Sequence, residues 1–101
     1  MESKKIGVFY HVEAENSISK IGAYIEENGY PETAERFADR LYAFGESLLI
    51  FSDKYPVCRF PKLAKRHFRC AVFEQNYIFI YKMLNKQLII YNVIHGRAIS
   101  H

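Results

Sequence analysis

A histidine, a glycine and an arginine close the last apolar run of the chain, in "LIIYNVIHGR" at residues 88–97. The His95 imidazole can carry protons near neutral pH, and the Arg97 guanidinium stays charged and can bind an anion. Gly96 allows a sharp turn, so we expect Arg97 to project beyond the end of a strand. For His95 two interpretations stay open, a proton shuttle or a hydrogen bond that closes the strand end.

Positive charge is concentrated in the second half of the sequence. Residues 1–53 hold five Lys/Arg and ten Asp/Glu, a balance of −5, whereas residues 54–101 hold nine Lys/Arg and one acid, a balance of +8. A cationic surface attracts polyanions such as nucleic acid or an acidic protein segment. From Lys54 to Arg69 there is no acidic residue, and this run is either a contact surface or a solvated loop. Its candidate contact residues are Arg59, Lys62, Lys65, Arg66, His67 and Arg69.

Cys58 and Cys70 are the two cysteines of the chain, and neither belongs to a CxxC motif or has a histidine at metal-ligand spacing. We predict two reduced thiols, with a disulfide or a zinc site as the alternatives. Neither a metal nor a cofactor is expected.

Hydrophobic periodicity predicts the elements that position these residues. Short runs of β-branched and aromatic residues indicate strands at 5–12, 67–74, 77–84 and 87–95, and apolar residues at helical spacing indicate helices at 14–29 and 31–51. Pro56 and Pro61 favour a loop over 52–66. The order β-α-α-β-β-β predicts an α+β domain, an antiparallel sheet with an α-helical hairpin packed on one face.

Alternation along 67–74 predicts which residues point to which side of the sheet. We expect Phe68, Cys70 and Val72 to face the helices, and His67, Arg69 and Ala71 to face the opposite side. For Arg69, an ion pair with Glu74 or with an acid of the helices is an alternative to target contact.

The totals fit one small domain. A chain of 101 residues is a single domain, residues 1–101, on size grounds. There is no apolar run long enough to cross a membrane and no signal peptide, so we expect a cytoplasmic protein without membrane contact.

Two segments together resemble the RelE/ParE superfamily of toxins from bacterial type II toxin–antitoxin modules. They are "FRCAVFEQNYIFIYKM" at 68–83 and "IIYNVIHGR" at 89–97. The resemblance implies one of two activities. RelE-like members are metal-independent endoribonucleases that cut mRNA in the ribosome, whereas ParE-like members poison DNA gyrase and are not catalysts.

Departures from the RelE pattern favour the ParE branch. Where RelE-like sequences carry cations this chain has Ala71 and Ile78, and its tail lacks the RelE-type tyrosine, which His101 could replace. If the chain is RelE-like, its implied catalytic residues are Arg69, His95, Arg97 and His101. If it is ParE-like, Arg97 joins the basic run as a contact with gyrase. A third hypothesis, outside the family, is a small non-catalytic nucleic-acid-binding module.

The resemblance also implies a cognate antitoxin that holds the toxin inactive in a heteromeric complex. Such a partner folds along the helical hairpin and the sheet, and the apolar stripe of 31–51 supplies the expected contacts, Phe37, Leu41, Phe44 and Leu48. The acidic first half favours basic residues in that partner.

Overall fold

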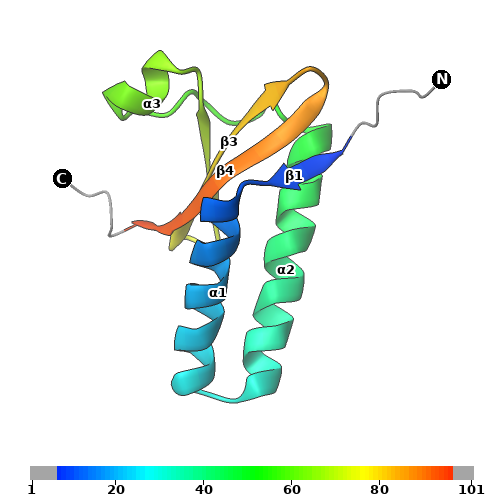
Figure 1. Cartoon of the computed structure of the whole chain (residues 1–101), viewed down its shortest axis with the longest axis vertical. Helices are drawn as coiled ribbons and strands as arrows, with labels where there is room; N and C mark the ends of the chain where they lie inside the picture. The colour runs from blue at the N-terminus through cyan, green and yellow to red at the C-terminus, as the bar shows by residue number, and fades with distance from the viewer. Residues whose placement is uncertain (1–6, 97–101) are drawn as a thin grey trace.

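The computed structural model describes residues 7–96 and contains seven elements within them (Figure 1). They are β1 (Val8–Tyr10), α1 (Val12–Glu27), α2 (Pro31–Ile50), α3 (Pro61–Lys65), β2 (Arg69–Phe73), β3 (Tyr77–Leu84) and β4 (Gln87–His95). The predicted order is confirmed. The short helix α3 lies where only loop was predicted, because Pro61 occupies the first helical turn, where a missing N–H has no effect.

The helices α1 and α2 form the predicted antiparallel hairpin. The side chain of His11 caps α1, since its Nδ1 accepts a hydrogen bond of 3.1 Å from the backbone N–H of Glu13. Pro31 opens α2 after a three-residue connection. No helix within residues 7–96 is both long and apolar enough to cross a membrane.

The four strands form one sheet in the order β1-β4-β3-β2. The antiparallel meander of β2, β3 and β4 is confirmed, and the turn between β3 and β4 is a two-residue turn in which Asn85 and Lys86 both have positive φ. β1 differs from the expectation of a wholly antiparallel sheet, because it pairs with β4 in parallel. The pairing is possible because the long helical hairpin carries the chain back to the end of the sheet where β1 begins, so that β2 and, after two antiparallel turns, β4 run in the same direction as β1.

The predicted orientation of β2 is wrong. Ala71 and Phe73 face the helices, where the Phe73 ring lies 5.8 Å from that of Phe37 and 5.1 Å from that of Phe44. Phe68 and Cys70 lie on the opposite side, in a second apolar cluster. The alternation is real, but apolar residues occupy both faces, so the pattern alone does not say which face the helices cover.

This second cluster lies beneath α3. Phe60 and Leu63 from the α3 segment pack on Phe68, just before β2, and on Ile80 of β3. The predicted open face of the sheet is therefore partly covered, and α3 with its basic side chains lies on top of it. In Figure 1 α3 lies at the end of the molecule opposite to the tip of the helical hairpin.

Candidate functional site

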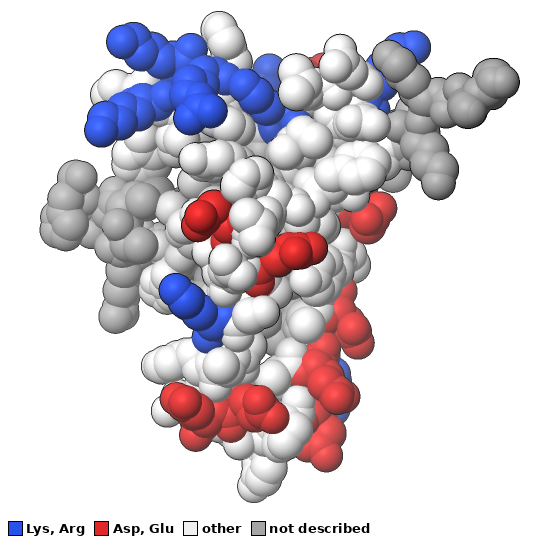
Figure 2. All heavy atoms as spheres, in the orientation of Figure 1, with Lys and Arg blue, Asp and Glu red and all other residues white. Residues whose placement is uncertain are grey.

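Six basic side chains gather around α3, and we call them the basic end: Arg59, Lys62, Lys65, Arg66, His67 and Lys82. The first five were predicted as contact residues, and all five are exposed. Figure 2 shows Lys and Arg side chains concentrated at this end, whereas Asp and Glu side chains collect toward the tip of the helical hairpin. The charge asymmetry of the sequence is thus also an asymmetry in space.

The end of α3 is fixed by backbone hydrogen bonds. His67 adopts a left-handed conformation, with φ of 65°. Its N–H donates to the carbonyl of Ala64 at 2.9 Å, and the N–H of Phe68 donates to the carbonyl of Leu63 at 3.1 Å. This is the Schellman arrangement, completed by the apolar contact of Leu63 with Phe68. The basic side chains of α3 therefore start from a fixed backbone.

Two cations of the basic end lie on aromatic rings. The guanidinium carbon of Arg66 lies 5.3 Å from the ring centre of Phe68 and 5.8 Å from that of Tyr91. The ammonium of Lys82 lies 4.7 Å from the ring centre of Phe68 and donates to the carbonyl of Arg66 at 3.0 Å. Cation–π contacts of this kind hold each charge in place without neutralising it.

Sequence reasoning missed Lys82. It lies near the end of β3, and Phe68 directly precedes the start of β2. In an antiparallel hairpin the end of one strand lies beside the start of the other, so counting residues from the connection after Phe73 would have placed Lys82 near α3.

The guanidinium of Arg69 makes polar contacts with other residues of the same chain. Its Nη1 donates to the backbone carbonyl of Tyr55, and its Nη2 lies 3.8 Å from Oδ1 of Asp53. The nearby Tyr81 hydroxyl donates to the carbonyl of Ser52 at 2.8 Å, and burial raises the pKa of Tyr81 to about 12 against the opposing effect of Arg69. The expected partner Glu74 instead pairs with Arg40, at 2.7 Å. Arg69 thus anchors the turn after α2.

The two cysteines are joined in a disulfide, contrary to the prediction of reduced thiols. The loop residues 56–58 run beside the start of β2, where the N–H of Cys58 donates to the carbonyl of Phe68 and the N–H of Cys70 donates to that of Pro56. This pairing brings the two Cα atoms to 4.9 Å. The disulfide therefore fastens the loop that leads into α3 to the sheet, a contact that a sequence separation of 12 does not reveal.

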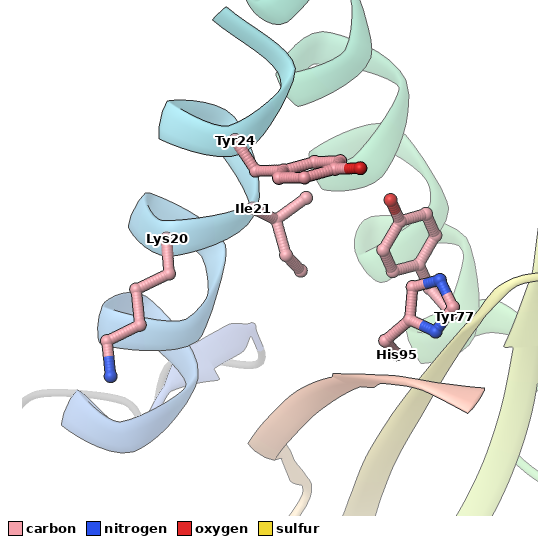
Figure 3. A pocket seen from close by; sticks show the side chains of 5 residues that line it. All are labelled: Lys20, Ile21, Tyr24, Tyr77 and His95. Carbon is pink, nitrogen blue, oxygen red and sulfur yellow. The ribbon is translucent and has the colours of Figure 1, made fainter. Parts of the chain in front are cut away.

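His95 lies at the other end of the sheet, in a hollow between α1 and β4. The hollow has a volume of about 350 Å³ and is lined by Lys20, Ile21, Tyr24, Tyr77 and His95 (Figure 3). The imidazole of His95 contacts the ring of Tyr77 edge-on, with 5.3 Å between the ring centres. Burial, and next the neighbouring Tyr24, raise the pKa of Tyr77.

The residues predicted to form one catalytic site are not brought together by the described structure. Two of them, Arg97 and His101, lie outside the described residues. Within residues 7–96 no three His, Cys, Asp or Glu side chains are gathered as metal ligands would be.

Comparison with known proteins identifies the family. A family model described as the ParE toxin of the type II toxin–antitoxin system parDE matches residues 8–99. The chain belongs to the ParE toxin family. A solved structure of the chromosomal ParDE toxin–antitoxin system of P. aeruginosa has the same fold, with a TM-score of 0.76 and 12% sequence identity. The likeness covers 89% of this chain and 95% of that one. No curated protein matches the sequence.

As a ParE toxin of a type II module, the chain has a cognate antitoxin as its implied partner. The residues predicted to contact that antitoxin form the core. Phe37, Leu41 and Leu48 are buried between α2 and the sheet, and the half-buried Phe44 packs on Phe79 with 5.0 Å between ring centres. The stripe that makes a helix amphipathic is the stripe it buries against its own sheet. Contact of these four residues with the antitoxin stays a prediction, and their burial leaves them little free surface.

Proposed function

We propose that this ParE toxin arrests bacterial growth by binding DNA gyrase and poisoning it, and that it is not itself a catalyst. The observation that carries the proposal is the separation of Arg69 from His95. Arg69 pairs with Tyr81 in the sheet and His95 pairs with Tyr77, so the two lie about 13 Å apart along β3 at 3.3 Å per residue. General acid–base catalysis of RNA cleavage needs its groups within hydrogen-bond reach of one phosphate.

The surroundings of Arg69 support the same proposal. Its guanidinium is engaged by Tyr55 and Asp53, and its strand neighbour Ala71 is fully buried. The side of the sheet on which a ribonuclease would display its cations is instead packed with apolar residues under α3. The RelE-like alternative thus has an engaged guanidinium at Arg69 and no cation at positions 71 and 78.

The basic end is the surface that we propose for the target. Its side chains are exposed, except for the half-buried Lys82, and those around α3 are held by a fixed backbone, which favours binding without a large loss of conformational entropy. Arg59, Lys62, Lys65, Arg66 and His67 remain proposed target contacts, and Lys82 joins them. Arg97 keeps its proposed target role, although it lies outside the described residues. A gyrase target also implies action in the cytoplasm, which the absence of a long apolar run in the sequence already predicted.

For the antitoxin we propose a heteromeric complex at the acidic helical hairpin. Glu26, Glu27, Glu32 and Glu35 are exposed near its tip, and the hollow beside His95 opens next to α1. A segment with basic and apolar residues that folds on binding would match both features. Co-purification with the product of the neighbouring reading frame tests this, and the proposal fails if charge reversal at Glu32 and Glu35 leaves the affinity unchanged.

Incorporation of labelled precursors tests the proposed function. The chain is induced alone in a bacterial host, and thymidine and methionine incorporation are followed over the first minutes. We expect DNA synthesis to stop first. If protein synthesis stops first, the RelE-like alternative holds. If growth continues while the chain binds nucleic acid in a salt-dependent manner, the third hypothesis, a nucleic-acid-binding module, replaces both.

A further inference from the structure

We infer that the basic end binds the phosphate backbone of duplex DNA directly. The inference rests on the proposed function, because gyrase holds duplex DNA, and it specifies that the toxin touches that DNA as well as the enzyme. Four observations on the described residues carry it: unpaired charge, backbone carbonyls that already accept hydrogen bonds, a polar outer layer, and the opposite charge at the far end of the molecule.

The cations of the basic end have no acidic partners among the described residues. The ion pairs of the described residues join Arg40 to Glu74 and Arg69 to Asp53. None of these four residues belongs to the basic end. Five Lys or Arg side chains therefore remain un-neutralised on a small surface, where they repel one another. A polyanion that binds there releases its counterions and relieves that repulsion.

Backbone acceptors that would repel a phosphate are already occupied. The carbonyl of Ala64 accepts from His67, that of Leu63 accepts from Phe68, and that of Arg66 accepts from the ammonium of Lys82. These three carbonyls are thus engaged within the protein, and the donors that face the solvent around them are the charged side chains of α3. Donors at a rigid position are what phosphate oxygens require.

The outer layer over α3 is polar, and the apolar hollow that Arg59 and Phe60 border, about 460 Å³ in volume, lies beside the helix and not at the centre of the basic side chains. Around α3 the apolar side chains Phe60 and Leu63 point toward the sheet and pack beneath the helix, and Phe68 is only 3% exposed. Protein interfaces usually place aromatic and apolar anchors at their centre, whereas interfaces with DNA are polar and strongly positive. This distinction favours DNA over an acidic protein segment.

The distribution of charge over the whole molecule also fits a DNA ligand. The acidic tip of the helical hairpin lies opposite the basic end (Figure 2). Near a duplex the two ends experience forces of opposite sign, so the molecule approaches with α3 toward the phosphates.

Fluorescence anisotropy with a labelled 20-base-pair duplex tests the inference on the full chain. Titrations at several salt concentrations give the slope of log K against log salt. About five phosphate contacts would give a slope near −4.5, at about 0.9 for each contact. We expect K62Q/K65Q, two exposed cations without described contacts, to make the slope shallower by about 2 and to weaken binding on the order of tenfold at low salt.

Two further variants keep the test informative. R66Q/K82Q removes the pair on the aromatic rings, with the same expected loss, and its folding is checked by circular dichroism. K20Q/R36Q removes the same charge from the helical hairpin and should leave duplex affinity within twofold. A slope near zero, or equal losses in K62Q/K65Q and K20Q/R36Q, would overturn the inference.

A third arm separates this inference from the proposed function. Binding to gyrase is measured without DNA for the same variants. If K62Q/K65Q loses affinity for DNA-free gyrase but keeps its affinity for the duplex, the basic end binds protein and the inference is overturned while the gyrase proposal stands. A duplex RNA that binds more than tenfold tighter than the DNA would overturn the choice of DNA.

Discussion

Arg69 and His95 lie at opposite ends of the sheet, opposite the two β3 residues Tyr81 and Tyr77 respectively. The resemblance to the wider superfamily placed both in one ribonuclease site. In the structure Arg69 instead holds the turn after α2, and His95 closes the hollow beside α1. Because the two residues have different surroundings, a substitution of one does not test the role of the other.

The first prediction concerns Arg69. R69Q should lower the free energy of unfolding by about 1–2 kcal/mol, because the half-buried guanidinium loses a charge-assisted hydrogen bond to the carbonyl of Tyr55. Urea denaturation followed by circular dichroism measures the loss. R59Q removes the same charge from an exposed position and should change stability by less than about 0.5 kcal/mol. Equal effects of the two substitutions would refute the anchoring role.

The second prediction concerns the contact between Gly45 and Tyr10. A Cβ at Gly45 would lie 2.1 Å from the hydroxyl oxygen of Tyr10 and 3.2 Å from the ring carbon that carries it. G45A should therefore destabilise by about 1–3 kcal/mol despite the better helix propensity of alanine. The Tyr10 hydroxyl has no hydrogen-bond partner among the described residues and its pKa is raised by burial, so Y10F should be neutral or stabilising.

The double variant G45A/Y10F completes this cycle by thermal denaturation. Without the hydroxyl the added methyl meets the Tyr10 ring and, at 3.4 Å, the ring of Phe79, so the loss caused by G45A should shrink by about 1 kcal/mol or more. Strictly additive effects would show that the hydroxyl does not set the size limit at position 45.

The third prediction concerns the disulfide. Closing a loop with a sequence separation of 12 stabilises the folded chain by about 3 kcal/mol in the chain-entropy estimate. The double variant C58A/C70A, and the natural chain in excess dithiothreitol, should both lose stability of this order. Because the bond fastens the loop before α3, amide exchange should accelerate first between residues 55 and 68. Unchanged stability and exchange on reduction would contradict the assignment.

The fourth prediction is a pH dependence. The hydrogen bond from Arg40 lowers the pKa of Glu74 below its ordinary value of 4.5. A carboxyl whose pKa is lowered in the folded state stabilises the fold above its ordinary pKa, and this contribution disappears as pH falls through the lowered value. E74Q should thus melt below the natural chain at pH 7, and the difference should shrink as the pH falls below 4.5. A difference that stays the same as the pH falls would show that the charge is not its cause.

Local features of the chain could be predicted from sequence. The bounds of β3 and β4 agree with the predicted 77–84 and 87–95, because Asn85 and Lys86 form a two-residue turn between two apolar runs. Pro31 likewise marks the start of α2. These features depend on neighbours in the chain, and a sequence displays them directly.

Non-local features were missed or reversed. The parallel pairing of Val8 with Leu88 and the bond between Cys58 and Cys70 depend on how distant segments are brought together. The face assignment of β2 failed because α3 covers the second side with Phe60 and Leu63, so that both sides are apolar. Most of the basic end could be predicted because its charges are close in sequence. Lys82 was missed because only the pairing of β3 with β2 brings it near α3.

The measurement that tests the central claim most directly uses purified DNA gyrase, a relaxed plasmid and the purified full chain. We expect the chain to inhibit supercoiling and to accumulate cleaved plasmid that appears as linear DNA after the enzyme is denatured. K20Q/R36Q should act as the natural chain does, and K62Q/K65Q should be weaker. Undisturbed supercoiling at a molar excess of the chain, together with cleavage of mRNA on added ribosomes, would contradict the account.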